Sequence, residues 1–297
     1  MKKQEKRIFL PEGFWQEEYK NELQDGSVPE SVLLNQKRLW LKDQTISCEP
    51  IRYMKNLKKL VVHNCVLEEF HCVCEAENIK RMTFVGSTFD KEDLSVLTHC
   101  KYLKMLSLNC MSAKGAEKLC NMDSLKGFSI RAVTDFSYME LQEFHKLTIL
   151  EVEGMNFHDY SFLTKMEKLT SLEIKEEGIR NLDFLPSLKN LVTFRMDDAA
   201  QDEGSLPQIQ CLKKLKEFCY PVKDLSVYQN LPKLKRIGVC NEGLQNIDSL
   251  AGSNVNDVQV LSVRSDEEMK NIIKEIKQYV ELLSYGAKWQ KGKEINR

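Results

Sequence analysis

Charged residues that recur at intervals of 22 positions are the most regular chemical feature of this sequence. Four residues of alternating charge follow the interval: Arg131, Glu153, Lys175 and Asp197. The carboxylates of Glu151 and Glu173 share the same spacing, and two adjacent carboxylates can serve as a general acid and a general base. Either arrangement requires residues 22 positions apart to be neighbours in space. The secondary-structure elements that carry these charged residues therefore determine whether the residues can form ion pairs or a catalytic pair.

Histidines and cysteines between residues 63 and 74 form a second candidate site, for a metal ion. The possible ligands are His63, Cys65, His71, Cys72 and Cys74. Their spacing is irregular and the C-x-C pair lacks the ligand geometry of zinc knuckles, which favours buried thiols and a surface histidine. The sequence contains no G-x-S-x-G, H-E-x-x-H, P-loop or dinucleotide-binding motif. We therefore expect neither an enzyme nor a bound metal or cofactor.

The composition narrows the class of partner and the compartment. The 297 residues include 43 Lys and Arg against 44 Asp and Glu, which gives no general reason to expect a nucleic acid or an anionic membrane as partner. No apolar run approaches the roughly 20 residues of a membrane-spanning helix, and the start lacks a signal-peptide pattern. The ten cysteines form no C-x-x-C pair or regular framework, which is typical of reduced thiols. A cytoplasmic location is predicted, although a chain trimmed of its export signal would look the same.

The charged residues belong to a repeat with the pattern L-x-x-L-x-L. Its first apolar positions, most of them 22 residues apart, are Leu57, Ile79, Leu103, Leu125, Leu147, Leu169, Leu191, Leu215, Leu234 and Val255. Alternation within the phrase predicts a strand, and apolar anchors three residues apart in the second half of each unit predict a tight 3₁₀ or helical turn. Two units of 24 residues carry their extra residues in this second half, before Leu94 and before Leu206. A strand-first repeat of this length stacks into a parallel sheet with one solvent-facing side.

This pattern resembles leucine-rich repeat proteins of the 22-residue class, which is found in bacterial internalins and in a eukaryotic phosphatase-regulating subunit. The resemblance covers about residues 35 to 264 and implies an α/β solenoid. Such a horseshoe has a parallel concave β-sheet, a convex side of irregular 3₁₀ turns and short helices, and a helical C-terminal cap. The family usually places Asn at the ninth repeat position, whereas this chain has Cys65, Ser87, Met111, Val133, Met155, Glu177 and Ala199 there. Without the usual asparagine ladder, the turn backbones must be satisfied by one another or by water.

Both ends of such a stack need a cap, because a terminal repeat otherwise exposes its apolar edge. We predict an N-terminal cap over residues 1–34, with a helix near Phe14 to Leu23, and about 10–11 repeat units over residues 35–264. Residues 265–297 are predicted to form a C-terminal capping helix and a tail, begun by a capping box of Ser265 and Glu268. One helical face would carry Met269, Ile272, Ile273, Ile276, Tyr279, Val280 and Leu283. The alternative is that this face binds a partner.

The third, fifth and seventh positions of each phrase should face the open concave surface, where equivalent positions of successive repeats become lateral neighbours. The predicted partner-binding residues fall into two patches. The first, near the N-terminus, is basic and aromatic: Arg38, Trp40, Lys42, Lys59, His63 and Arg81. The second, around the middle of the chain, is charged: Arg131, Glu151, Glu153, Glu173, Lys175, Arg195 and Asp197.

Each patch also has an interpretation that needs no partner. The alternating charges could neutralise one another laterally, and the N-terminal cap could fold over Trp40 and bury it. The composition also favours binding, because a tryptophan flanked by Arg38 and Lys42 is typical of an interface hot spot. Repulsion between Glu151 and Glu173 would be relieved by a cationic group of a partner.

These expectations favour a non-enzymatic scaffold that recognises another protein or a peptide through the concave sheet, with no nucleic acid or membrane partner. A shallow open face cannot exclude water around a substrate, which argues against catalysis by Glu151 and Glu173. The alternative is a regulatory subunit, inhibitor, adaptor or toxin-neutralising protein that acts on an enzyme in trans. It would use the same surface, so the sequence leaves the partner open.

Overall fold

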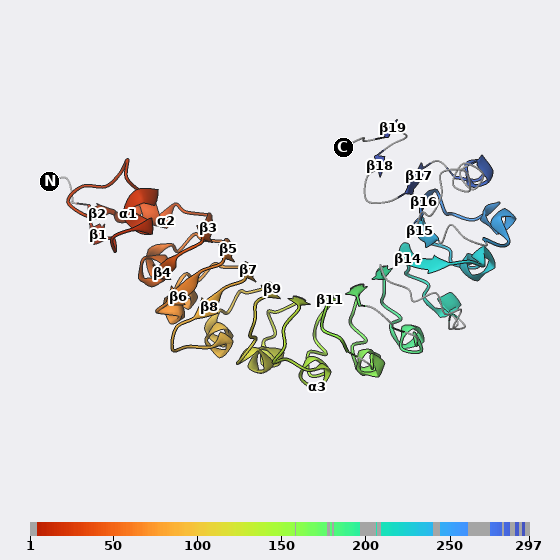
Figure 1. The fold of residues 1–297 in the computed structure, drawn as a ribbon, viewed down its shortest axis with the longest axis horizontal. Coiled ribbons are helices and arrows are strands. Elements are labelled where there is room, and N and C mark those ends of the chain that lie inside the picture. Colours follow the sequence, from red (N-terminus) through yellow and green to blue (C-terminus); the bar gives the residue numbers. More distant parts are fainter. Residues whose placement is uncertain are drawn as a thin grey trace. The chain divides into compact units, whose positions relative to one another are not determined.

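The computed structural model divides the chain into two compact units. Unit 1 comprises Met1–Leu147 and unit 2 comprises Thr148–Arg297, so the boundary falls inside the repeat array. The structure describes residues 5–157, 159–176, 179, 181–196, 206, 209–239, 244–260, 274–280, 282–285, 289–290 and 293–294. Both units are built from the same repeated combination of one strand and one short helical turn (Figure 1).

A parallel sheet runs through the repeats of unit 1. Its strands, in the order in which they pair, are β3 (Arg38–Lys42), β5 (Lys59–His63), β7 (Arg81–Val85), β9 (Met105–Asn109) and β10 (Gly127–Arg131). Equivalent repeat positions lie opposite one another, and Leu60, for example, pairs with Leu39 on one side and with Met82 on the other. The apolar fourth and sixth positions are buried while most positions between them face outward, which confirms the predicted register.

Short 3₁₀ helices form the opposite side of unit 1 (Figure 1). They are η1 (Glu49–Tyr53), η2 (Phe70–Glu75), η3 (Leu94–His99) and η4 (Ala116–Asn121), and the last repeat has the α-helical turn α3 (Tyr138–Leu141) instead. Three of the connecting segments add a small parallel sheet of β4 (Thr45–Ser47), β6 (Val66–Glu68) and β8 (Thr88–Phe89). The spacing of the apolar anchors thus predicted these tight turns correctly, because a side chain every third residue suits 3₁₀ geometry.

The core of unit 1 lies between the sheet and the 3₁₀ helices. First repeat positions such as Leu57 and Leu103 are fully buried. The rings of Phe70, Phe84 and Phe89 meet with centroids 4.5–5.6 Å apart. Aromatic pairs at such distances add about 0.5–1.5 kcal/mol each beyond the burial of their area. The strands therefore rest on a packed layer that holds their outward side chains in a fixed arrangement.

Residues 5–34 close the first repeat of unit 1. They form β1 (Arg7–Phe9), α1 (Phe14–Glu18), β2 (Ser27–Pro29) and α2 (Glu30–Leu34), with β1 and β2 paired antiparallel. Trp15 of α1 is buried, and its indole Nε1 donates a hydrogen bond to the backbone oxygen of Ser47 at 2.8 Å. This bond ties the cap to β4 of the first repeat.

The helix of this segment is shorter than the predicted span of Phe14 to Leu23. It ends at Glu18, and the chain then turns tightly before β2, where Gln24 and Ser27 exchange backbone hydrogen bonds. The two residues between them have positive φ angles of 49° and 72°, which a right-handed helix cannot contain. The helix ends before this turn, and at Tyr19, the residue after Glu18, the φ of −109° and ψ of 24° lie outside the α-helical region.

Unit 2 repeats the same combination. Its parallel strands are β11 (Ile149–Glu153), β12 (Ser171–Lys175), β13 (Thr193–Met196), β14 (Glu217–Val222), β15 (Arg236–Val239), β16 (Asp257–Val260) and β17 (Leu282–Tyr285). The 3₁₀ helices between them are η5 (Ser161–Lys165), η6 (Leu185–Ser187), η7 (Ile209–Cys211), η8 (Leu225–Tyr228) and η9 (Ile247–Leu250). Leu172 pairs with Leu150 on one side and with Phe194 on the other, so the register again follows the repeat. A short antiparallel pair, β18 (Trp289–Gln290) and β19 (Lys293–Glu294), follows β17.

The C-terminal segment adds a strand to the sheet of unit 2. Leu283, predicted on the apolar face of a capping helix, lies instead in β17, which pairs in parallel with β16. This pairing satisfies backbone groups along a sheet edge that would otherwise lack partners. Residues 274–276 are helical. Five residues of the predicted capping helix lie outside the described residues: Ser265, Glu268, Met269, Ile272 and Ile273.

Side chains of the following repeat take the place of the asparagine ladder at several turns. Ser87 Oγ accepts a hydrogen bond from the backbone nitrogen of Cys65 at 3.2 Å. Glu176, which is only 3% exposed, accepts from the backbone nitrogens of Met155 at 2.5 Å and of Asn156 at 2.9 Å, one with each carboxylate oxygen. The expectation that these backbones are satisfied by one another or by water was incomplete, because polar side chains at nearby positions reach them.

Candidate functional site

Basic and aromatic residues lie side by side on the strand face of unit 1, the side of the sheet turned away from the 3₁₀ helices. Parallel pairing places Lys59 between Arg38 and Arg81, so the three cations form a row across β3, β5 and β7. Adjacent strands are about 4.8 Å apart, which puts these charges within reach of one ligand. Lys42 lies opposite His63 at the other end of these strands. Together with the tryptophan of β3 they form the cationic patch: Arg38, Trp40, Lys42, Lys59, His63 and Arg81.

Trp40 stands in the middle of β3 with 54% of its surface exposed. Its neighbour on β5 is the buried Val61. The N-terminal cap, which could have covered Trp40, leaves it exposed and buries Trp15 instead. Apolar surface left in water costs about 25 cal/mol per Å², so an exposed indole is a source of binding free energy. Trp40 is therefore available to a partner.

The cations at the start of the strands have no acidic partners. Within the described part of the chain, none of Arg38, Lys59 and Arg81 forms a salt bridge. Lys42 differs, because its Nζ lies 3.2 Å from Asp43 Oδ2. Hydrogen bonds from Asn64 and then from Lys42 lower the pKa of Asp43, so this carboxylate stays charged. Unneutralised positive charge is thus concentrated at the first residues of β3, β5 and β7.

A second row of cations, which the sequence-based prediction missed, borders this patch. It consists of Lys37, Lys58, Lys80 and Lys104, each exposed and each at the second position of its repeat. The backbone nitrogen of each of the last three donates to the carbonyl oxygen of the one before it at 2.9–3.0 Å, so the four are direct neighbours. We call them the lysine row. The prediction considered only alternate strand positions, whereas comparing the second positions of the unit 1 repeats would have revealed a lysine in each.

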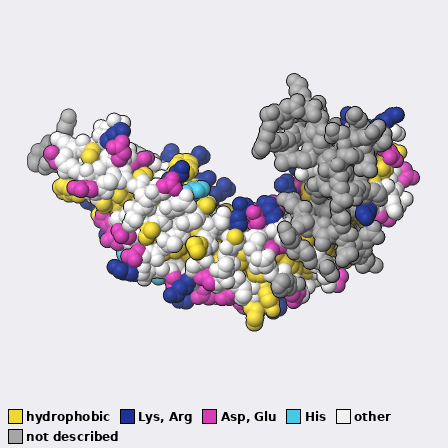
Figure 2. All heavy atoms as spheres, in the orientation of Figure 1, with side chains coloured by type: hydrophobic (Ala, Val, Ile, Leu, Met, Phe, Trp, Pro, Cys, Tyr) yellow, Lys and Arg dark blue, Asp and Glu magenta, His cyan; other side chains and the backbone are white. Residues whose placement is uncertain are grey.

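Acidic residues are absent from the strand face around these cations. In β3, β5, β7, β9 and β10, all of which the structure describes, the third, fifth and seventh repeat positions contain no Asp or Glu. Figure 2 shows Lys and Arg side chains, in dark blue, gathered along the upper rim of the part that unit 1 forms. The whole chain has a net charge of −1. The positive charge on the strand face of unit 1 is therefore local, and acidic residues elsewhere in the chain balance it.

In unit 2, three carboxylates of the second predicted patch share one cation, Lys175. Glu151, Glu173 and Arg195 lie opposite one another on β11, β12 and β13, which confirms their predicted alignment. Lys175 Nζ lies 2.8 Å from Glu173 Oε1, 3.2 Å from Glu151 Oε1 and 3.7 Å from Glu153 Oε2. The repulsion between Glu151 and Glu173 is thereby relieved without a partner.

Further along unit 2, arginines and acidic residues on adjacent strands pair in the same way. Arg195 Nη2 lies 2.6 Å from Glu217 Oε1, and Arg236 Nε lies 2.5 Å from Asp257 Oδ2. Arg236 also approaches the second oxygen of Glu217 at 3.7 Å. Among the described residues, these cations of unit 2 are thus paired with carboxylates of its own strand face, unlike Arg38, Lys59 and Arg81 of unit 1.

Two neighbour pairs of the predicted alternating ladder, Arg131 with Glu153 and Lys175 with Asp197, stay predictions. Arg131 ends β10 in unit 1 and Glu153 ends β11 in unit 2, so each is placed within its own unit. Asp197 lies outside the described residues. Lateral neutralisation is therefore observed for the members of the ladder around Lys175.

Replacing Lys175 with methionine should destabilise unit 2. The change leaves three carboxylates without their shared cation, and we expect the free energy of unfolding at neutral pH to fall by about 1 kcal/mol, as for other partly exposed ion pairs. Burial lowers the pKa of Lys175, but hydrogen bonds to Glu173 and Glu151 outweigh it, so the pKa is raised from its ordinary 10.5. A raised lysine pKa stabilises the folded state below the ordinary value, and this stabilisation is lost as the pH rises through the raised value.

Urea unfolding followed by circular dichroism at about pH 8 and about pH 11, on either side of the ordinary lysine pKa, measures this effect. The deficit of Lys175→Met should be full at the lower pH and smaller at the higher one. Lys168→Met changes an exposed lysine of the turn before β12 and serves as the control, with little effect at either pH. An equal deficit at both pH values would attribute the loss to packing instead of charge.

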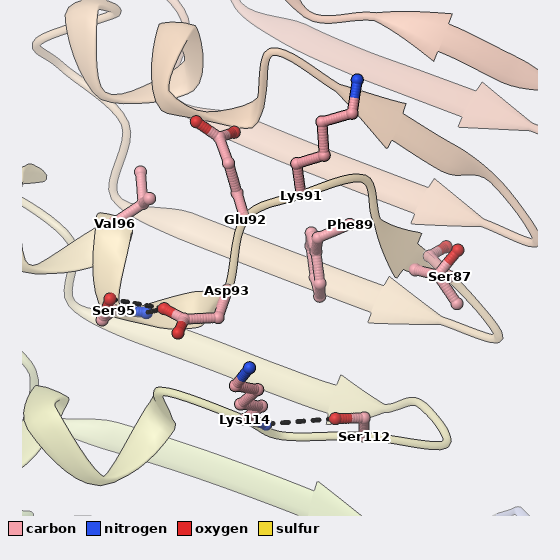
Figure 3. Close-up of a pocket in the computed structure, with 10 residues that line it drawn as sticks. Ser87, Phe89, Lys91, Glu92, Asp93, Ser95, Val96, Ser112 and Lys114 are labelled. Atoms are coloured by element: carbon pink, nitrogen blue, oxygen red, sulfur yellow. Dashed lines mark hydrogen bonds between the residues drawn. The ribbon is translucent and has the colours of Figure 1, made fainter.

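A hollow of about 640 Å³ lies beside η3, where the first 24-residue repeat carries its extra residues (Figure 3). Glu92, Asp93, Ser95 and Lys114 are among the residues that line it. Asp93 Oδ1 accepts a hydrogen bond from the backbone nitrogen of Ser95 at 2.9 Å, and Glu92 Oε1 lies 2.7 Å from His71 Nδ1. Glu92 and Asp93 at the hollow therefore already have partners within the fold. The hollow lies where this repeat has its extra residues.

The five histidine and cysteine candidates for a metal site do not converge on one point, although His71 Nε2 lies 3.6 Å from Cys72 Sγ. His63 belongs to the strand face, whereas Cys72 is buried in η2. Among the described residues, no three His, Cys, Asp or Glu side chains are grouped so that they could hold a metal ion. In that same part of the chain, no helix has the length and apolar character needed to cross a bilayer.

Comparison with known proteins identifies the fold. No protein-family model and no curated protein matches the chain. A leucine-rich repeat protein of Leptospira interrogans is similar with a TM-score of 0.52 at 16% identity, over 80% of this chain and 62% of that chain. An internalin (inlF) of Listeria monocytogenes matches with a TM-score of 0.49 at 14% identity, over 92% and 94% of the two chains. Internalin C2 of the same organism matches at 0.39 and 18%, over 78% and 84%.

The chain has the leucine-rich repeat fold, an α/β solenoid. The similarity to the Leptospira protein and the in-register pairing of equivalent repeat positions establish this, as the repeat pattern implied. In repeat folds of this kind, each repeat contacts its neighbours and the stack presents an extended surface suited to binding other proteins. In this fold the strand face of each unit is the surface on which the charged and aromatic residues described above lie.

Proposed function

We propose that this chain is a non-enzymatic recognition protein that binds another protein or a peptide through the cationic patch of unit 1. The exposed indole of Trp40, set among cations on a strand face without acidic residues, is the observation that carries the proposal. Tryptophan and arginine are enriched at the hot spots of interfaces, where a few such residues supply most of the binding free energy. The packed repeats hold the patch in place before binding, so little ordering entropy is lost.

The charged residues of unit 2 contribute less in this proposal. A partner that paired with Glu151 or Glu173 would have to displace Lys175, which already lies within 3.2 Å of both. The exchange of one ion pair for another leaves little net gain, because partly exposed pairs contribute about 0–1 kcal/mol. The strongest contacts should therefore form at the cationic patch.

Trp40→Ala tests the proposal. Tagged wild-type protein and the variant are used to capture proteins from a native lysate, which are then quantified by mass spectrometry. We expect at least one captured protein whose recovery falls about tenfold or more with Trp40→Ala, as for loss of a hot-spot residue.

Phe9→Ala is the matched control, because Phe9 is 74% exposed but lies on β1 of the N-terminal segment. Its capture profile should equal that of the wild type. Circular dichroism should show the same fold for all three proteins. Equal recovery of every protein with Trp40→Ala and wild type would refute the role of the patch.

A further inference from the structure

We infer that the segment recognised by unit 1 is acidic: an extended peptide with several Asp or Glu side chains that lies across β3, β5, β7 and β9 along the lysine row. The inference rests on the proposed function and specifies the chemistry of the partner. It also extends the site beyond the cationic patch to Lys37, Lys58, Lys80 and Lys104.

The backbone holds the lysine row and the first row of the cationic patch side by side. The carbonyl oxygen of Lys37 accepts hydrogen bonds from the nitrogens of both Lys58 and Lys59, at 2.9 and 3.3 Å. The carbonyl oxygen of Lys58 accepts in the same way from Lys80 and Arg81, at 3.0 and 3.2 Å. With strands about 4.8 Å apart, four successive lysines span about 14 Å. An extended peptide covers that distance with four to five residues, at about 3.3 Å each.

The charge of these two rows is not neutralised within the fold. Within the described residues, no salt bridge involves Lys37, Lys58, Lys80 or Lys104. Like charges on adjacent strands repel one another, and this repulsion is present along both rows. An anionic ligand would relieve it at several positions together.

Unit 2 differs from unit 1 at the third repeat positions, which lie next to its own lysines. Lys216 and Lys235 also occupy second repeat positions, and the nitrogen of Lys235 donates to the oxygen of Lys216 at 2.8 Å. There, however, the third positions include the acidic residues Glu217 and Asp257, which pair with Arg236. The corresponding positions of unit 1 hold Arg38, Lys59 and Arg81. Among the described residues, a third-position row made only of cations is therefore a feature of unit 1.

An acidic peptide suits these rows better than a nucleic acid does. Proteins that bind single strands stack successive bases on several aromatic side chains. On the strand face of β3, β5, β7, β9 and β10, Trp40 is the sole Trp, Tyr or Phe. Trp40, two residues beyond Arg38, would instead take an apolar side chain of the peptide.

The probe is a fluorescein-labelled peptide of about eight residues in which Glu alternates with Ser, long enough to extend past the row. Its binding to the full chain is measured by fluorescence anisotropy at low salt, where the Debye length approaches about 30 Å. A peptide with Gln in place of Glu has the same length without the charge. The row variant combines Lys37→Gln, Lys58→Gln, Lys80→Gln and Lys104→Gln. The control variant removes four exposed lysines that lie outside the strand starts: Lys91→Gln, Lys114→Gln, Lys118→Gln and Lys165→Gln.

We expect the Glu peptide to bind the wild type and the control variant alike. Its affinity should fall at least tenfold with the row variant, since steering by a charged patch changes binding by about 10–10³. The Gln peptide should bind the wild type at least tenfold more weakly than the Glu peptide does. High salt should weaken binding of the Glu peptide by a similar factor. No binding of the Glu peptide, equal binding of the Gln peptide, or equal losses in the two variants would overturn the inference.

A single-stranded oligothymidylate of similar length tests the other polyanion. Binding at least ten times tighter than that of the Glu peptide, with the same loss in the row variant, would overturn the inference in favour of nucleic acid. The recognition function is judged separately by Trp40→Ala. Loss of captured proteins in that variant without binding of the Glu peptide would leave the proposed function standing and remove the acidic partner.

Discussion

Trp15→Ala is expected to lower the free energy of unfolding by about 3–5 kcal/mol, the usual cost of removing a large buried aromatic side chain. Trp15 is 1% exposed and stacks on Tyr19 with ring centroids 6.5 Å apart. Its Nε1 also donates the 2.8 Å hydrogen bond to Ser47 that joins the N-terminal segment to β4. The substitution leaves a cavity in this segment and removes a donor from a backbone carbonyl.

The damage should begin at the first repeat, because each repeat of a solenoid contacts only its neighbours. That repeat contains β3, which carries Arg38, Trp40 and Lys42 of the proposed binding site. Hydrogen exchange should therefore accelerate in residues 38–47 of Trp15→Ala while β9 and β10 stay protected. Partner capture should weaken as well, although the substituted residue lies outside the strand face.

Trp40→Ala is the matched control for stability, since it makes the same chemical change at an exposed site. We expect it to alter the free energy of unfolding by about 0.5 kcal/mol or less. Trp15→Phe keeps most of the packing, loses the hydrogen bond, and should fall between the two. Urea unfolding followed by circular dichroism compares them. Equal effects of Trp15→Ala and Trp40→Ala would show that the indole of Trp15 does not anchor the N-terminal segment.

The strands and turns were predictable because their apolar side chains must be buried at fixed intervals. Leu57 and Leu103 begin phrases in the sequence and are fully buried in the structure. The alignment of Glu151 with Glu173 followed from the same count, because parallel strands of equal repeats pair in register. Periodicity thus determines which positions are neighbours.

The ion pairs were harder to predict, because a long side chain chooses among several neighbours. Lys175 was expected to meet charges at its own repeat position on adjacent strands. Its shortest contact is instead with Glu173, two residues earlier on the same strand and on the same face. Which carboxylate the amine meets depends on the rotamer of the Lys175 side chain, and the repeat pattern does not specify rotamers.

The lysine row was overlooked for a geometrical reason. Alternation applies only within a strand, and Lys58 and Lys80 stand just before β5 and β7 begin. Their side chains are exposed although they share parity with the buried fourth and sixth positions. Strand boundaries, which a sequence pattern locates poorly, therefore hid a feature that is regular in the repeats themselves.

Glu176 was also missed, and its replacement should have the second large effect on stability. The expected ladder residue was the ninth of each repeat, whereas Glu176 is the eighth and is nearly fully buried. Its two oxygens accept from the backbone nitrogens of Met155 and Asn156 at 2.5 and 2.9 Å. Burial, with a smaller contribution from this carboxylate, raises the pKa of the nearby Tyr160. The acceptor thus lies where water cannot readily replace it.

Glu176→Ala should lower the free energy of unfolding by about 2–6 kcal/mol, because the buried backbone donor of Met155 and the partly buried one of Asn156 lose their acceptor at about 1–3 kcal/mol each. Glu176→Gln keeps one carbonyl oxygen and should lose about half as much. Glu167→Ala, at an exposed glutamate of the same repeat array, is the control and should change stability little. Urea unfolding gives the differences, and hydrogen exchange should accelerate at the amides of Met155 and Asn156. If Glu176→Ala were no more costly than Glu167→Ala, the turn would be held by its own backbone, as first expected for a solenoid without an asparagine ladder.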